Sequence, residues 1–233
     1  MHPRVCFLVI SSHGAEYEMM KTLWRLHARK GLRPGSDVWF LHGSTSSESS
    51  LPGCPDDITF PSISESMIPG ILDKTVSAFE RCGGFDVVVR TNLSSVYVFD
   101  RLYEYIDSFM DRGIDAAGCS EDQSHFSGCN MILSRKCVRY ILDNKHMLDY
   151  TIIDDVALSQ LLFANTKLIR EWVPRLDFID EVVLFHSHTP KMDDNASYHH
   201  IRLKSSDRCK DIMRMFNLLA GPPVLMNGDP LSP

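Results

Sequence analysis

Short, unbroken apolar runs alternate with helix-length segments along the first half of this sequence. The runs cover Val5–Ile10 and residues 37–41, 85–89 and 114–119, and they lack the polar–apolar alternation of a strand with one exposed face. Such strands are typical of parallel sheets that are covered on both faces. Between the runs, apolar residues recur at helical spacing within 17–29, 67–81 and 99–110. This order of strands and helices predicts an α/β fold with a mostly parallel central sheet flanked by helices.

The pattern changes after Gly118. Residues 167–173, 181–185 and 200–203 have the composition of strands, and residues 136–142, 156–163 and 208–219 that of helices. The final residues, 221–233, are rich in proline and glycine. We expect one domain over residues 1–220, followed by a tail or the start of a linker over 221–233, so the chain is compatible with being part of a longer multidomain protein.

Composition and motifs exclude several classes of function. The net charge of −6 lacks the basic footprint of a nucleic-acid-binding protein, and no G-x-G-x-x-G or Walker A pattern occurs. The first apolar run is too short to span a membrane, and no signal-like cleavage region follows it. Seven cysteines without a C-x-x-C pair favour free thiols. We therefore expect a cytoplasmic protein without a membrane-spanning segment and without a nucleic-acid partner.

A cluster of small polar side chains follows the β-branched run at 85–89. It contains Arg90, Thr91, Asn92 and Ser94. In an open α/β sheet, ligands bind outside the carboxyl ends of the strands. The cluster is therefore a candidate small-molecule site, and a buried strand followed by a polar turn is the alternative.

Two adjacent aspartates, Asp154 and Asp155, precede an apolar helical segment. An aspartate at a helix start often caps backbone N–H groups and lies at the positive end of the helix dipole. One cap needs only one carboxylate, so the other aspartate is a candidate general base.

Histidines occur in two clusters. His186 and His188 are two residues apart at the end of a predicted strand, a spacing that puts both on one side and suits metal ligation; surface histidines are the alternative. In the second cluster, alternation puts His200, Arg202 and Lys204 on one strand face, as donors for a phosphate or diphosphate. A solvated edge strand explains that pattern equally well.

Four segments in order resemble motifs of the inverting β1,3-glycosyltransferases of the fringe and β1,3-galactosyltransferase type. They are a helix carrying Lys74-Thr75 before the strand ending at Asn92, the segment 127–135 ending in Leu-Ser-Arg, the pair Asp154-Asp155, and residues 185–188. The order and approximate spacing agree from Val5 to His188.

The resemblance implies a GT-A-like single domain with a small additional antiparallel part, a UDP-sugar donor with galactose as one candidate sugar, and a glycan acceptor. It implies Asp155 as the base that accepts the proton of the acceptor hydroxyl, which gives inversion by direct displacement, and Asp154 as the cap. It also implies a nucleotide-sugar site that includes Ser11, Ser12, His13, Lys74, Arg90, Thr91, Asn92, Ser94, Ser127, Gly128 and Cys129.

The sequence departs from this family at the metal motif. Where the family has the acidic D-x-D motif that holds Mn²⁺, this chain has Thr91-Asn92-Leu93-Ser94-Ser95. Neutral oxygens bind a divalent ion poorly by comparison with carboxylates. Three alternatives remain: Asn92 with His188 holds a weakly bound Mn²⁺ or Mg²⁺; Arg202, Lys204 and Arg208 replace the metal; or the chain is a non-catalytic module that binds a sugar nucleotide or a glycan.

Overall fold

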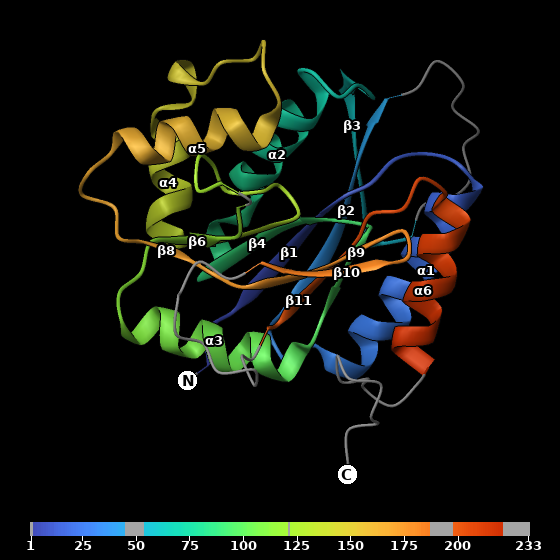
Figure 1. Ribbon diagram of the computed structural model, residues 1–233. Helices are drawn as coiled ribbons and strands as arrows, with labels where there is room; N and C mark the ends of the chain where they lie inside the picture. Colours follow the sequence, from blue (N-terminus) through green and yellow to red (C-terminus); the bar gives the residue numbers. More distant parts are fainter. Residues whose placement is uncertain (1, 45–53, 121, 187–197, 221–233) are drawn as a thin grey trace.

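The computed structural model describes residues 2–44, 54–120, 122–186 and 198–220 (Figure 1). The predicted tail at 221–233 lies outside the described residues. The described helices are α1 (Ala15–Gly31), α2 (Gly70–Arg81), α3 (Phe99–Asp111), α4 (Arg135–Asp143), α5 (Asp154–Ala164) and α6 (Arg208–Ala220), with short 3₁₀ turns at Cys82–Gly84 and Lys145–Met147. None of these helices is both long and apolar enough to cross a membrane.

A seven-stranded sheet forms the centre of the molecule. Its order is β3 (Asp57–Ser64), β2 (Asp37–Ser44), β1 (Val5–Ile10), β4 (Val87–Asn92), β7 (Asn130–Ser134), β6 (Ala116–Gly118) and β8 (Arg170–Trp172). Every neighbouring pair is parallel except the two pairs that involve β7. The predicted mostly parallel α/β sheet is therefore confirmed.

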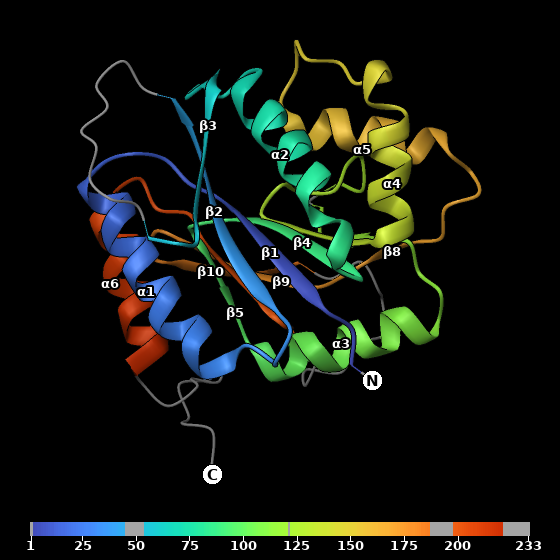
Figure 2. The same ribbon diagram turned by 180° about the vertical axis from the view of Figure 1, so that it is seen from behind.

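Helices cover both faces of this sheet, and this explains why its strands read as unbroken apolar runs. Along β1, Val5, Phe7 and Val9 pack into one core with α1, α3 and α6, whereas Cys6 and Leu8 pack into the other with α2, α4 and α5. Figures 1 and 2 show α2, α4 and α5 grouped on one side of the sheet, away from α3. Because successive side chains of a strand point to opposite faces, each residue of β1 meets a core.

A second, smaller sheet of four strands lies beside the first. Its order is β10 (Val182–His186), β9 (Arg175–Ile179), β11 (His200–Leu203) and β5 (Ser95–Tyr97). The β10–β9 and β11–β5 pairs are antiparallel, and β9 and β11 are parallel. This sheet is the predicted small additional part, and one parallel pair makes it mixed.

Several local expectations were wrong in detail. The strand predicted at 37–41 is longer than expected: His42 and Gly43 lie inside β2, because pairing with β3 extends that strand to Ser44. The strands β5 and β9 were not predicted. β5 has only three residues, too few for a periodic pattern, and β9 alternates in composition because one of its faces buries charged side chains.

Candidate active site at the carboxyl ends of β1 and β4

A cavity of about 350 Å³ opens where β1 and β4 end. Ile10, Ser11 and Ser12 line it from β1, and Asn92, Leu93 and Ser94 line it from β4. The chain builds β2 and β3 on one side of β1 and then returns to place β4 on the other. The cavity therefore lies at the topological switch point, where ligands bind in open α/β sheets.

The predicted polar cluster at the carboxyl end of β4 is only partly free to contact a ligand. The Thr91 hydroxyl is fully buried and donates to the Cys129 carbonyl at 2.7 Å. The Asn92 side-chain oxygen accepts hydrogen bonds from the hydroxyls of Ser94 at 2.9 Å and Ser95 at 3.1 Å. Because the side-chain oxygen of Asn92 is occupied in this way, its NH₂ group is what remains for a ligand. An NH₂ group can only donate hydrogen bonds.

Lys74 does not line the cavity but supports two residues that do. Its ammonium is completely buried and donates to the Glu65 carboxylate at 2.5 Å and to the Ser11 carbonyl at 3.3 Å. Burial lowers the pKa of Lys74, and the Glu65 carboxylate opposes this shift. Glu65 also accepts the Gly43 N–H at 2.6 Å. Glu65 was not predicted, although it follows β3 just as Ser11 follows β1, so the same strand-end rule could have found it.

The two adjacent aspartates have different surroundings. Asp154 is buried and forms an ion pair with Arg90, which is itself buried on β4. The cap position of α5 is Ile153, so Asp154, expected as the cap, is instead the first residue of the helix. Burial raises the pKa of Asp154, and the Arg90 guanidinium opposes this rise.

Asp155 is half-buried and is held by backbone donors. Its carboxylate accepts hydrogen bonds from the backbone N–H of Gly128 at 2.9 Å and from the backbone N–H of the next residue, Val156, at 3.0 Å. Gly128 also allows a close approach: a Cβ built there would lie 2.3 Å from Nη1 of Arg90 and 3.2 Å from Cβ of Asp155. The segment 127–130 thus fits against the aspartate pair only because residue 128 has no side chain. Asp155 itself does not line the cavity described above.

Hydrogen bonds join this acidic pair to the cavity through Cys129. Its carbonyl accepts from Thr91 and, at 3.1 Å, from Ser95, the same hydroxyl that donates to Asn92. The Ser127 hydroxyl lies 3.2 Å from the Cys129 sulfur. The predicted residues on β4, in the segment 127–129 and at the start of α5 therefore form one connected group.

The predicted basic donors on β11 lie elsewhere. His200 is completely buried against Tyr97, and burial lowers its pKa well below the usual value, so it is not an exposed cationic donor. Arg202 is half-buried opposite Asp177 and Ser95 in the strand register, and Lys204 is exposed. Neither lines the cavity. Among the described lining residues the basic side chain is Arg208, which Asp211 holds at 3.0 Å.

The histidines expected near the ligand divide between described and undescribed residues. His13 lies beside the cavity end of β1, where its Nε2 is 3.2 Å from the Gly43 carbonyl. His186 lies 3.3 Å from the buried Asp177. His188 lies outside the described residues, so its pairing with Asn92 stays a prediction.

The metal that the resemblance implies does not fit the described residues at the D-x-D position. That position offers no carboxylate, and the oxygens of Thr91 and Asn92 already take part in hydrogen bonds within the protein. The carboxylate that does line the cavity, Glu65, is paired with Lys74. Hard divalent cations prefer uncommitted oxygen ligands.

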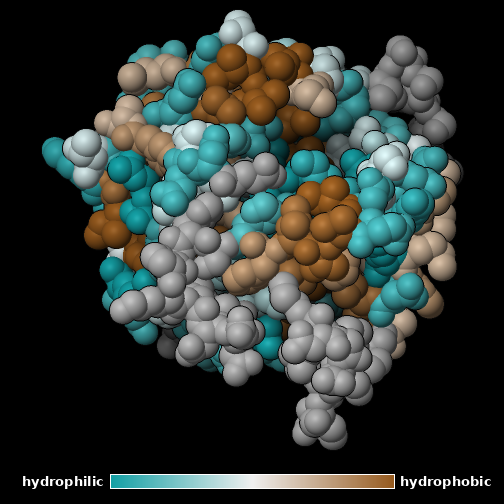
Figure 3. Space-filling model, viewed as in Figure 1, coloured by the Kyte–Doolittle hydropathy of each residue, from teal (hydrophilic) through white to brown (hydrophobic). Residues whose placement is uncertain are grey.

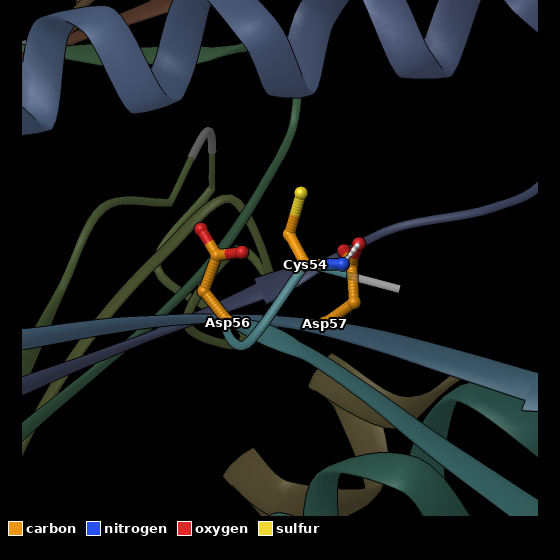
Figure 4. Close-up of side chains that lie close together, drawn as sticks. All are labelled: Cys54, Asp56 and Asp57. Carbon is orange, nitrogen blue, oxygen red and sulfur yellow. Dashed lines mark hydrogen bonds between the residues drawn. The ribbon is translucent and has the colours of Figure 1, made fainter. Parts of the chain in front are cut away.

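Three potential metal ligands lie together elsewhere, at the start of β3. Figure 4 shows Cys54, Asp56 and Asp57 side by side. Arg25 donates to both oxygens of Asp56, at 2.9–3.2 Å. Asp57 lies 3.3 Å from the ammonium of Lys21 and 3.0 Å from Arg25. Because protein cations already balance both carboxylates, this cluster is a salt-bridge network.

The sheet order, the flanking helices, the small second sheet and the cavity at the switch point together define a GT-A-like fold. Among solved structures, the chain is similar to a glycosyltransferase involved in the glycosylation of the major capsid of PBCV-1. The identity is 9%, the TM-score is 0.50, and the match covers 90% of this chain and 98% of that one. A putative nucleotide-diphospho-sugar transferase from Desulfovibrio desulfuricans G20 matches over 74% of this chain and 80% of its own, with 13% identity and a TM-score of 0.45.

The likeness to the first of these structures concerns the fold alone. No protein-family model and no curated protein matches the sequence. The narrower resemblance to the fringe and β1,3-galactosyltransferase type therefore stays a prediction.

Proposed function

We propose that this protein is a glycosyltransferase that moves a sugar from a UDP-sugar, with galactose as one candidate, to a hydroxyl of a glycan acceptor, with inversion at the anomeric carbon. The observation that carries the proposal is the cavity at the switch point between β1 and β4 in a GT-A-like fold. Hydroxyl and amide groups of Ser11, Ser12, Asn92 and Ser94 gather there, as a nucleotide diphosphate requires.

The positive charge in this cavity comes from Arg208. A diphosphate that leaves carries developing negative charge, and a fixed cation in the site stabilises it without reorganisation. The carboxylate of Asp211 orients the guanidinium of Arg208, whose side chain keeps 46% of its surface exposed. We assign to Arg208 the role of replacing the metal in stabilising the diphosphate, which the sequence suggested for Arg202, Lys204 and Arg208 together.

Asp155 is the general base in this proposal. Asp154 is committed to Arg90, whereas Asp155 is held by backbone N–H groups and keeps lone pairs for a proton. In the reaction, the acceptor hydroxyl transfers its proton to Asp155 while its oxygen bonds to the anomeric carbon. The bond from that carbon to the diphosphate oxygen breaks, and UDP departs.

The test combines UDP release with UDP binding. Asp155→Asn should lower turnover by about 10²–10⁴, the usual contribution of a general base, while calorimetry gives an unchanged affinity for UDP. Asp143→Asn, at an exposed position at the end of α4, is the matched control and should keep full turnover. Normal turnover by Asp155→Asn would remove this residue from the role.

A second candidate function is a non-catalytic module that binds a sugar nucleotide or a glycan. The absence of a carboxylate at positions 91–95 favours it, because the family's metal-assisted departure of the diphosphate has no ligands there. Tight UDP binding without UDP release from any UDP-sugar, with or without glycan acceptors, would identify this function.

A further inference from the structure

The edge strand β10 exposes four consecutive apolar residues. Val182, Val183, Leu184 and Phe185 keep 54%, 45%, 42% and 38% of their surfaces exposed. Figure 3 shows a hydrophobic patch on the face where Figure 1 places β10 and β9. Apolar side chains on both faces of an edge strand are rare in monomers, because such an edge is a template for pairing with another chain.

One edge of β10 is open in the described part of the chain. Among the described strands, β10 pairs only with β9. The opposite edge of the same sheet is β5, whose three residues are all buried. Pairing through this edge closes after two copies, since a two-fold axis uses the same surface on both subunits.

The hairpin that carries β10 is fixed in place. Arg214 of α6 donates to the Asp180 carbonyl in the turn before β10, and it lies 3.6 Å from the Glu181 carboxylate. Asp180 also accepts from the backbone N–H of Ser206 at 3.1 Å. A strand that is already held in position loses little conformational entropy when it binds.

The charges at the two ends of β10 are complementary to a second copy. Asp180 and Glu181 precede the strand and His186 ends it. In a two-fold antiparallel pairing, one residue must lie opposite its own copy. When that residue is Val183, Val182 lies opposite Leu184 of the second copy and Asp180 lies opposite its His186. The pairing then matches Val182 with Leu184, brings an acidic end to each histidine and sets Glu181 opposite Phe185.

From these observations we infer that β10 is a homodimer interface, at which two copies of this chain join their small sheets edge to edge. A strand edge of this length buries less area than a standard interface, and interfaces of that size are typical of weak, transient complexes. This inference does not depend on the proposed activity.

Sedimentation of the whole chain over a range of concentrations tests the interface. The chain should shift from monomer to dimer as its concentration rises through the micromolar range. Val183→Lys places two ammonium groups opposite each other at the axis and should weaken the dimer at least about tenfold. Met19→Lys, at an apolar position on α1 with 55% exposure, is the matched control and should leave the dimer unchanged.

A mixing experiment tests the register. Val183→Lys and Val183→Glu should each be monomeric alone, and an equal mixture should form a mixed dimer, because the lysine then faces a glutamate. Circular dichroism of each variant checks that the fold is intact. A chain that stays monomeric at every concentration, or a dimer that Met19→Lys weakens as much as Val183→Lys does, would overturn the inference.

Discussion

The ion pair between Arg90 and Asp154 gives the sharpest prediction about this site. Both side chains are almost completely buried, with 4% and 9% of their surfaces exposed, and they link β4 to the start of α5. Arg90→Met keeps a long side chain but removes the charge, which leaves a buried carboxylate without its partner. Breaking a buried pair by removing one member costs about 3–5 kcal/mol.

This cost is measurable by urea unfolding. With a slope of about 2 kcal/mol per molar urea, a loss of about 4 kcal/mol moves the midpoint down by about 2 M. Asp154 in the variant is relieved when it takes up a proton, so the deficit should shrink as the pH falls. The matched control is Arg112→Met: Arg112 pairs with Glu171 at 2.9 Å, but the two side chains are 47% and 32% exposed. The free energy of unfolding lost in Arg112→Met should stay below about 1 kcal/mol.

A double variant separates the cost of an unpaired buried charge from the loss of the ion pair itself. In Arg90→Met with Asp154→Leu neither charge of this pair remains, and replacing a buried ion pair by apolar residues is often neutral or stabilising. The double variant should therefore recover most of the lost stability. A loss below about 1 kcal/mol for Arg90→Met, or a double variant no more stable than the single one, would refute the buried-pair argument.

Three further predictions concern pH, metal and close packing. Burial, with Lys21 nearby, lowers the pKa of His42 to about 4. The unfolded chain takes up this proton near pH 6.5, so the free energy of unfolding should decrease as the pH is lowered from 6.5 to 4. This residue contributes at most about 1.4 kcal/mol per pH unit to the decrease. Urea unfolding at several pH values in that range should show a weaker dependence of the free energy of unfolding on pH for His42→Gln. His146→Gln, which alters an exposed histidine, should leave that pH dependence unchanged. Asn92→Asp restores a carboxylate to the cavity and should raise the affinity for Mn²⁺ in the presence of UDP by about tenfold or more; equal Mn²⁺ binding by the parent chain in calorimetry would contradict our interpretation of Asn92. Gly128→Ala forces a Cβ against Arg90 and should cost about 1–3 kcal/mol in thermal unfolding, whereas Gly83→Ala, where a Cβ meets nothing within 4 Å, should show no such loss.

The sequence by itself determined the layered architecture. Unbroken apolar runs such as Val5–Ile10 require cover on both faces, and the helices that supply this cover follow from their apolar spacing. The strand-end rule also found Asn92 and Ser94, and the family resemblance added Ser11 and Ser12; all four line one cavity. These features could be predicted because they depend on residues close together in the chain and on a property that all parallel sheets share.

The tertiary structure alone decided which chemistry each polar residue can perform. Asp154 and Asp155 are equivalent in sequence and differ because Arg90, 64 residues earlier, pairs with one of them. Glu65 meets Lys74 across a turn, Asn92 has its oxygen occupied by Ser94 and Ser95, and Arg208 reaches a cavity built by strands more than a hundred residues before it. The membership of the small sheet likewise needed the parallel pairing of β9 with β11. In each case the protonation state or the availability of a group depends on partners that only the folded chain brings within hydrogen-bond distance, and local sequence carries no record of them.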